Sequence, residues 1–156
     1  MDEDTVHQIL IAYGPKAFWS VVFERTPGAE VETTQPLISI VDDDELVREA
    51  VTGLIRSLGY RVAAFGSAEA FLRSRQLSRT ACLIADINMP AMSGLELVRR
   101  LSSSGEVIPT ILITAYPDDR SRESALDAGV RCYMVKPFDE SELLSCIDEA
   151  LSSKAC

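Results

Sequence analysis

Three carboxylates in this sequence lie at the ends of apolar runs, where acids that do chemistry are often found in α/β proteins. Asp86 ends the apolar part of the stretch 83–90, LIADINMP, and a proline follows it four positions later. Asp42 and Asp43 follow a second, β-branched run. Each pattern indicates a buried strand that presents its acids at its carboxyl end, with Asp86 alone on its strand.

Five short β-prone segments alternate with five segments of helical periodicity from Leu37 onward. The expected strands are 37–41, 60–65, 81–86, 108–113 and 130–135, and the expected helices are 46–58, 67–75, 94–103, 118–128 and 139–151. Ser67 and Asp139 are candidate N-caps, and Gly59 is a candidate C-terminal stop. The alternation predicts a doubly wound (βα)5 fold, with a five-stranded parallel sheet covered on both faces.

Polar residues end four of the five predicted strands. They are three carboxylates, one hydroxyl and one ammonium: Asp42, Asp43, Asp86, Thr114 and Lys136. Because ligands in open parallel sheets bind at the carboxyl ends of the strands, near the point where strand order reverses, we expect these side chains to converge.

Such a cluster points to a cation and a phosphoryl group. Three close carboxylates repel one another, and a divalent cation relieves that repulsion; all-oxygen ligands favour Mg²⁺ or Mn²⁺ over zinc. Mg²⁺ often also takes a phosphate oxygen. Asp86 is then the candidate phosphoryl acceptor by nucleophilic catalysis, and Asp42 and Asp43 hold the metal. Lys136 balances the phosphoryl charge, and Thr114 donates it a hydrogen bond.

Each of these residues also has an ordinary structural interpretation. The acids 42–44 precede a helix and could be N-caps, and Asp86 could form a turn. Lys136 could be a solvated surface side chain, and Thr114 could be without consequence. The occurrence of all five at the ends of four strands in one predicted sheet favours the functional interpretation.

Composition excludes several other classes. The formal net charge is −9, with 24 acidic and 15 basic residues, which argues against a nucleic-acid surface. None of the four cysteines forms a CxxC pair and His7 is the only histidine, so no zinc site is expected. The sequence has no run of about 18 apolar residues and starts with acids, which predicts a cytoplasmic protein without a membrane helix or signal peptide.

The sequence resembles a two-component response-regulator receiver domain. The matching segments are IVDDDELVR at 40–48, LIADINMPAMSGLEL at 83–97, PTILITAY at 109–116 and AGVRCYMVKPF at 128–138. The resemblance runs from Leu37 to Leu151 and is strongest to FixJ-type (CheY-like) receivers, on the segment GYRVAAFGSAEAFL at 59–72. It implies the flavodoxin-like strand order 2-1-3-4-5.

The resemblance also implies roles for particular residues. Asp86 would accept a phosphoryl group from a sensor histidine kinase, a phosphotransfer protein or a small phosphodonor. Mg²⁺ (or Mn²⁺) would be bound by Asp42, Asp43, Asp86 and the backbone carbonyl of Asn88. The phosphoryl group would contact Thr114, Ala115 and Lys136, and the Lys136–Pro137 peptide would be cis. Asn88 and Tyr116 would tune dephosphorylation, with the bulk of Tyr116 shielding the acyl phosphate.

The same family resemblance predicts how a signal would leave the domain. Thr114 would rotate toward the phosphoryl group and Tyr133 would follow it inward, although Tyr133 could also be a plain strand aromatic. The face built from 118–128, 130–135 and 139–151 would then change its affinity for a downstream protein or a second copy of the chain. The chain is expected to catalyse only its own phosphorylation and dephosphorylation, and to contact neither nucleic acid nor membrane.

The predicted organisation is an N-terminal extension and linker at 1–36, poorly ordered or a short hairpin, a receiver domain at 37–153 and a tail at 154–156. The chain would be a stand-alone receiver or a transcriptional regulator truncated before its DNA-binding domain. Alternatives are a Mg²⁺-dependent aspartyl-phosphate phosphatase, whose DxDx(T/V) motif fails at 42–46, and a phosphorylation-silent interaction module. A flavodoxin-like carrier and P-loop chemistry lack their phosphate-loop motifs.

Overall fold

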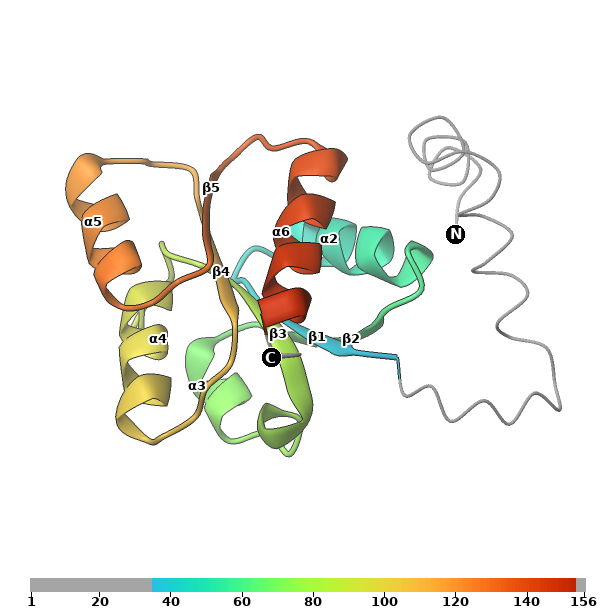
Figure 1. Cartoon of the computed structure of the whole chain (residues 1–156), viewed down its shortest axis with the longest axis horizontal. Helices are drawn as coiled ribbons and strands as arrows, with labels where there is room; N and C mark the ends of the chain where they lie inside the picture. Colours follow the sequence, from blue (N-terminus) through green and yellow to red (C-terminus); the bar gives the residue numbers. More distant parts are fainter. Residues whose placement is uncertain (1–34, 154–156) are drawn as a thin grey trace, which may run out of the picture.

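The structure, a computed structural model, describes residues 35–153. One five-stranded parallel sheet runs in the order β2-β1-β3-β4-β5 (Figure 1). Its strands are β1 (Leu37–Val41), β2 (Arg61–Phe65), β3 (Thr80–Asp86), β4 (Thr110–Thr114) and β5 (Cys132–Val135). The helices are α2 (Glu45–Ser57), α3 (Ala68–Leu72), α4 (Gly94–Ser103), α5 (Asp119–Asp127) and α6 (Glu140–Ser153). The predicted (βα)5 fold and its strand order are confirmed.

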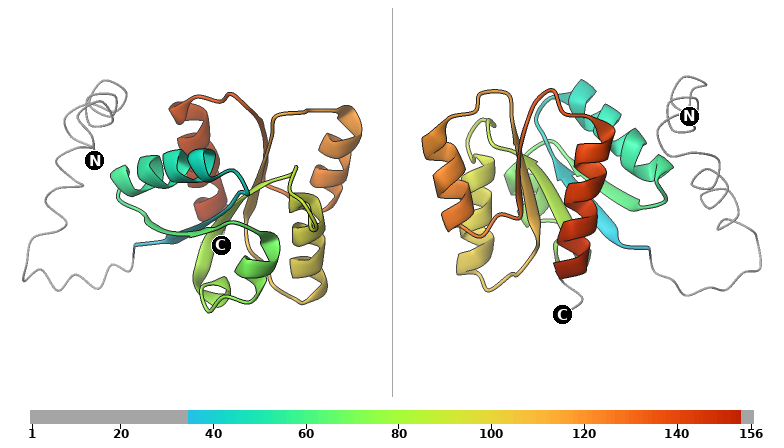
Figure 2. Two further views of the ribbon diagram at one scale, coloured as in Figure 1. Left: turned by 180° about the vertical axis from the view of Figure 1, so that it is seen from behind. Right: turned by 45° about the horizontal axis from the view of Figure 1, so that its top comes forward.

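Two hydrophobic cores lie on opposite faces of the sheet. Strands β1, β3 and β4 are buried along almost their whole length, as expected for parallel strands covered on both faces. One core joins the sheet to α3, α4 and α5 and includes Phe71, Leu83, Leu97, Leu112 and Ala125. The other joins it to α2 and α6 and includes Ile38, Ile55, Ile84, Ile111, Leu143 and Ile147. Figures 1 and 2 show α2 beside α6, and α4 beside α5.

Local hydrogen bonds fix where the helices begin and end. The Ser67 hydroxyl accepts from the Ala70 N–H at 3.1 Å, and the Asp139 carboxylate accepts from the Glu142 N–H at 2.8 Å, so both predicted N-caps are present. Gly59, with a φ of 95°, follows the C-cap of α2 in the left-handed region that glycine adopts without strain. Helix α2 is capped by Asp44, which leaves the two acids before it free for other contacts.

Most predicted boundaries agree with the structure to within two residues, and three of the differences have a clear local cause. The helix predicted to reach Arg75 ends at Leu72, because the Ser74 hydroxyl accepts from the Gln76 N–H and forms a turn that leads into a 3₁₀ segment at Leu77–Arg79. Strand β4 begins at Thr110 rather than 108, after a proline that has no N–H for the ladder. Strand β5 begins at Cys132 rather than 130, because the Gly129 and Val130 N–H groups donate to carbonyls of α5 instead of to the sheet.

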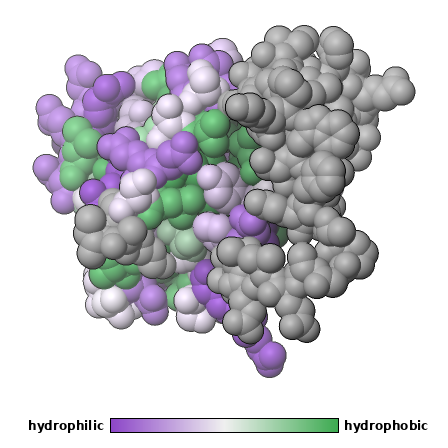
Figure 3. Space-filling view, turned by 45° about the vertical axis from the view of Figure 1, so that its right-hand side comes forward, coloured by the Kyte–Doolittle hydropathy of each residue, from purple (hydrophilic) through white to green (hydrophobic). Residues whose placement is uncertain are grey.

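Apolar side chains also reach the surface. In Figure 3, green hydrophobic residues of the described part lie in small groups among purple hydrophilic ones. Leu46, Val107, Tyr116 and Leu126 are each more than half exposed. Isolated exposed apolar residues are normal in globular proteins, so they do not by themselves mark an interface.

The predictions for the two ends of the chain stay predictions. Almost all of the predicted extension at 1–36, with its hairpin, lies outside the described residues, as does the tail at 154–156. Within 35–153, no helix has the length and apolar character needed to cross a membrane.

The thiol of Cys82 on β3 gives a test of the packing between the sheet and the helices α2 and α6. Burial, together with the charge of Cys146, raises the pKa of the Cys82 thiol to about 12, well above its ordinary value. Because the thiolate is the reactive form, alkylation of Cys82 by iodoacetamide at pH 8 should be at least about a thousandfold slower than in the urea-unfolded chain. Peptide mass mapping of a time course measures this, and equal rates in the folded and unfolded chains would contradict the packing.

Candidate functional site

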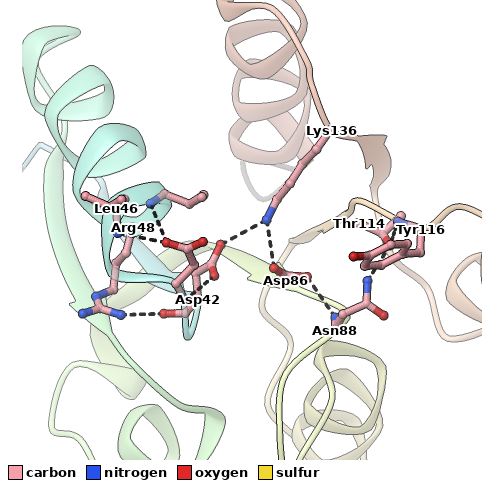
Figure 4. Close-up of polar contacts among 10 residues, drawn as sticks. Asp42, Leu46, Arg48, Asp86, Asn88, Thr114, Tyr116 and Lys136 are labelled. Carbon is pink, nitrogen blue, oxygen red and sulfur yellow. Dashed lines mark hydrogen bonds and ion pairs between the residues drawn. The ribbon is translucent and has the colours of Figure 1, made fainter.

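The carboxyl ends of β1, β3, β4 and β5 bring the predicted residues together at one edge of the sheet. The strand registers pair Val41 with Ala85, Asp86 with Ile113, and Thr114 with Val135. Residues that lie far apart in the chain therefore end on neighbouring rungs, and Figure 4 shows Asp42, Asp86 and Lys136 pointing toward one another. Carboxylate oxygens of Asp42, Asp43 and Asp86 lie within 4.8 Å of one another.

A lysine holds the centre of this site. The Lys136 Nζ lies 2.9 Å from Asp86 Oδ2 and 3.5 Å from Asp42 Oδ2 (Figure 4). Both carboxylates are almost buried, at 7% and 5% exposure. Burial alone would lower the pKa of Lys136, but its hydrogen bond to Asp86 and the charges of Asp86 and Asp42 outweigh burial and raise that pKa. The ammonium is therefore charged at neutral pH and neutralises one of the clustered acids.

Asp42 is held in place by backbone groups of two other residues and by a side chain of helix α2. Its Oδ1 accepts from the Asp44 N–H at 2.9 Å, and its N–H donates to the Phe65 carbonyl at 3.1 Å. The Arg48 guanidinium donates to the Asp42 carbonyl at 2.7 Å. Sequence reasoning missed Arg48, although its place six residues after Asp42 on the expected helix was a signal that it could reach back to the acidic loop.

The donor set fits a small hard cation. Burial raises the pKa of the Asp42 carboxyl, and the Asp86 charge adds to that shift, while the Asp44 N–H and Lys136 oppose it. Three carboxylates against one ammonium leave an excess of negative charge at the edge of the sheet, with exposed Asp43 on its solvent side. Oxygens bound to one Mg²⁺ lie at most ~4.2 Å from one another, so atoms that already lie within 4.8 Å of one another could share an ion after a small movement. Asp42, Asp43 and Asp86 would hold the ion.

A second group of contacts lies on the other side of Asp86. The Asn88 N–H donates to Asp86 Oδ1 at 2.9 Å, and the Asn88 side-chain amide donates to Thr114 Oγ1 at 2.8 Å. The Tyr116 N–H also donates to Thr114 Oγ1, at 3.0 Å. Figure 4 shows Tyr116 beside Thr114, with Asn88 between them and Asp86. The sequence predicted that the Asn88 carbonyl binds the metal and that Asn88 affects the rate of dephosphorylation, but it did not predict this side-chain contact.

The other predicted residues surround this group. Ala115 follows Thr114 at the surface, and the Lys136–Pro137 peptide bond is cis. The Tyr133 hydroxyl is already buried and has no hydrogen-bond partner, and its ring packs against the core under α4 and α5. The Arg122 guanidinium carbon lies 5.1 Å from the centroid of the Tyr133 ring, so a cation on α5 covers this aromatic side chain.

Gly94 sets how closely α4 approaches Asp86. A Cβ at Gly94 would lie 2.5 Å from the Asp86 carbonyl oxygen and 3.1 Å from a Leu112 methyl. The loop that leads there places Ala91 at a φ of 66°, in the left-handed region that is costly for a side-chain-bearing residue. The first turn of α4 therefore packs closely against the end of β3, where Asp86 lies.

Comparisons with known proteins agree with this geometry. The family model of the response regulator receiver domain matches residues 38–148. Response regulator protein TmoT of Ectopseudomonas mendocina is 44% identical over 117 residues, covering 75% of this chain and 53% of TmoT. Transcriptional regulatory protein FixJ of Rhizobium meliloti is 36% identical over 117 residues, covering 75% of this chain and 57% of FixJ.

A solved structure supports the same relationship. The crystal structure of FixJ-N superposes with a TM-score of 0.69 at 33% identity, covering 76% of this chain and 94% of that one. The chain spans about half the length of the curated relatives that it matches. The likeness therefore concerns one domain of those proteins.

Substitution of Gly94 tests how tightly the site is packed. Gly94→Ala should lower the free energy of unfolding by about 1–3 kcal/mol, because the new methyl group collides with backbone at Asp86. Gly53→Ala is the matched control, since nothing lies within 4 Å of a Cβ at that helical position. It should raise the free energy of unfolding by up to about 1 kcal/mol. Urea denaturation measures both, and equal effects of the two substitutions would contradict the close approach of α4.

Proposed function

Because the chain belongs to the response-regulator receiver family, we propose that it is a phosphorylation-dependent signalling switch whose phosphoryl acceptor is Asp86. The observation that carries the proposal is the position of Asp86 at the end of the central strand, 2.9 Å from the Lys136 ammonium and close to two further carboxylates. Receiver domains are signalling domains rather than enzymes with a separate substrate. The chemistry proposed here is therefore the chain's own modification.

In this proposal, the Asp86 carboxylate is the nucleophile that attacks phosphorus. An Asp86 oxygen forms a bond to phosphorus, while the bond from phosphorus to the donor's nitrogen or oxygen breaks and the leaving group keeps the electron pair. The Lys136 ammonium, which is 2.9 Å from Asp86, would then bind the phosphoryl oxygens and offset their negative charge. Thr114 and the backbone at Ala115 contact the same group.

A divalent cation completes the site in this proposal. Asp42, Asp43, Asp86 and the Asn88 carbonyl would hold Mg²⁺ (or Mn²⁺), and the ion would supply positive charge next to the incoming phosphoryl oxygens. The excess negative charge of the cluster and the raised pKa of Asp42 support a cation at this place. Without a cation, the same charges would repel an anionic donor.

The proposed output is a change in protein contacts on the face formed by α5, β5 and α6. Thr114 and Tyr133 would link this face to the acceptor, since Thr114 ends β4 and Tyr133 lies on the neighbouring strand. The donor would be a sensor histidine kinase or a phosphotransfer protein, and the reader would be a downstream protein or a second copy of the chain. Transcriptional control, which the name of FixJ indicates for that relative, would need a further domain.

Incubation with acetyl phosphate and Mg²⁺, followed by intact mass measurement, tests the acceptor. The wild type should gain one phosphoryl group, and Asp86→Asn should gain none, because the amide is not a nucleophile for phosphorus. Asp127→Asn, which changes an exposed acid on α5, is the matched control and should be modified like the wild type. Chelation of Mg²⁺ with EDTA should abolish the adduct.

The alternatives give different outcomes in the same assay. Absence of an adduct at saturating donor would favour a phosphorylation-silent interaction module. Continuous release of inorganic phosphate at many turnovers per minute, without accumulation of an adduct, would favour an aspartyl-phosphate phosphatase. Equal modification of Asp86→Asn would overturn the assignment of the acceptor.

Tyr116 gives a second test, of the lifetime of the phosphoryl group. Tyr116 is 75% exposed and lies beside Thr114 (Figure 4), and in this proposal its ring would shield the acyl phosphate from water. Tyr116→Ala should therefore lose the phosphoryl group several-fold faster than the wild type after the donor is removed. Leu126→Ala, which truncates another exposed apolar side chain on α5, is the control and should leave the rate unchanged. An unchanged rate in Tyr116→Ala would show that the ring does not shield the site.

A further inference from the structure

Asn88 makes separate contacts to the two residues that the proposed function connects. Its backbone N–H donates to Asp86 Oδ1 at 2.9 Å, and its side-chain Nδ2 donates to Thr114 Oγ1 at 2.8 Å. Figure 4 shows the side chain of Asn88 extending from the end of β3 toward Thr114 at the end of β4. One residue thus joins the acceptor to the hydroxyl that is expected to contact the phosphoryl group.

The Thr114 hydroxyl oxygen already accepts two hydrogen bonds. Its oxygen accepts from Asn88 Nδ2 and from the Tyr116 N–H at 3.0 Å, which uses both lone pairs of a hydroxyl oxygen. Thr114 is only 1% exposed, so water does not compete freely for that oxygen. The side chain is β-branched and has few alternative χ1 rotamers. Its orientation in this structure is therefore well defined, and it is directed at Asn88 rather than at Asp86.

We propose that the side-chain amide of Asn88 is a positioning group that holds the Thr114 hydroxyl in its resting orientation. This inference rests on the proposed function, in which Thr114 contacts a phosphoryl group on Asp86. To do so, Thr114 has to rotate, and the Asn88–Thr114 hydrogen bond breaks. The bond then stabilises only the resting state, and such a differential contact shifts the balance between two states.

The backbone and the side chain of Asn88 have separable roles in this account. The backbone carbonyl, a proposed metal ligand, remains when the side chain is shortened, and so does the N–H that donates to Asp86. Asn88 is itself exposed, so its truncation leaves no cavity in the core. Asn88→Ala therefore removes the contact to Thr114 while it leaves the contacts at Asp86 in place.

Equilibrium binding of beryllium trifluoride, a phosphoryl analogue, tests the inference without a kinetic step. With saturating Mg²⁺, Asn88→Ala should bind the analogue about two- to tenfold more tightly than the wild type, as expected when one neutral hydrogen bond is lost from the resting state alone. Isothermal titration measures the affinity. The affinity for Mg²⁺ is measured in parallel, because general damage to the loop would weaken the binding of both the ion and the analogue.

A double-mutant cycle shows whether the effect acts through the Thr114 hydroxyl. In a Thr114→Val background, Asn88→Ala should change the affinity for the analogue by less than the error of the measurement. In a Thr114→Ser background, which keeps a hydroxyl, the tightening should persist.

The possible outcomes separate this inference from the proposed function. Unchanged or weaker binding by Asn88→Ala, or a tightening that persists in Thr114→Val, would overturn the positioning role while Asp86 stays the acceptor. Binding of the analogue that is equally tight in Asp86→Asn would instead overturn the proposed function.

Discussion

Repulsion among like charges is the constraint on which the rest of this structure depends. Three carboxylates lie within reach of one another at the edge of a sheet, and two of them are nearly buried. Burying such groups is costly unless a cation offsets their charge. Lys136 provides part of that charge by pairing with Asp86 and Asp42. The negative charge that remains at the site is what the proposed Mg²⁺ would offset.

The fold maintains this arrangement because its strands cannot shift independently. Strand β3 is central and covered on both faces, so a change of register would move buried side chains such as Leu83 and Ile84 to the wrong core. The acid at its end is further fixed by α4, which approaches closely through Gly94. Contacts to Asp86 from Lys136 and from the Asn88 N–H occupy both carboxylate oxygens. A displacement of Asp86 would therefore disturb its contacts to Lys136, which follows β5, and to Asn88, which follows β3.

The sequence was sufficient to predict the order of strands and helices from periodicity and the site from the polar strand ends, whereas the strand order in the sheet came from the family resemblance. Alternation of β-prone and helical segments, with Ser67 and Asp139 as caps, indicated the element order, and polar strand ends indicated the site. Boundaries were less certain where a proline or a serine side chain competes for backbone hydrogen bonds, as at the start of β4 and the end of α3. The side-chain contact of Asn88 to Thr114 depends on a rotamer and a loop path that no sequence pattern records, whereas the spacing of Arg48 from Asp42 was a signal for its contact to the acidic loop.

The central claim is that Asp86 carries the phosphoryl group, and the most direct test is to locate the modified residue chemically. Borohydride reduces an acyl phosphate to an alcohol, so the phosphorylated chain should yield homoserine in place of aspartate at the modified position. Peptide mass spectrometry should find homoserine at position 86 alone, in an amount that follows the phosphorylated fraction. Homoserine at position 42 or 43, or no reduced residue in a chain that carries phosphate, would contradict the account.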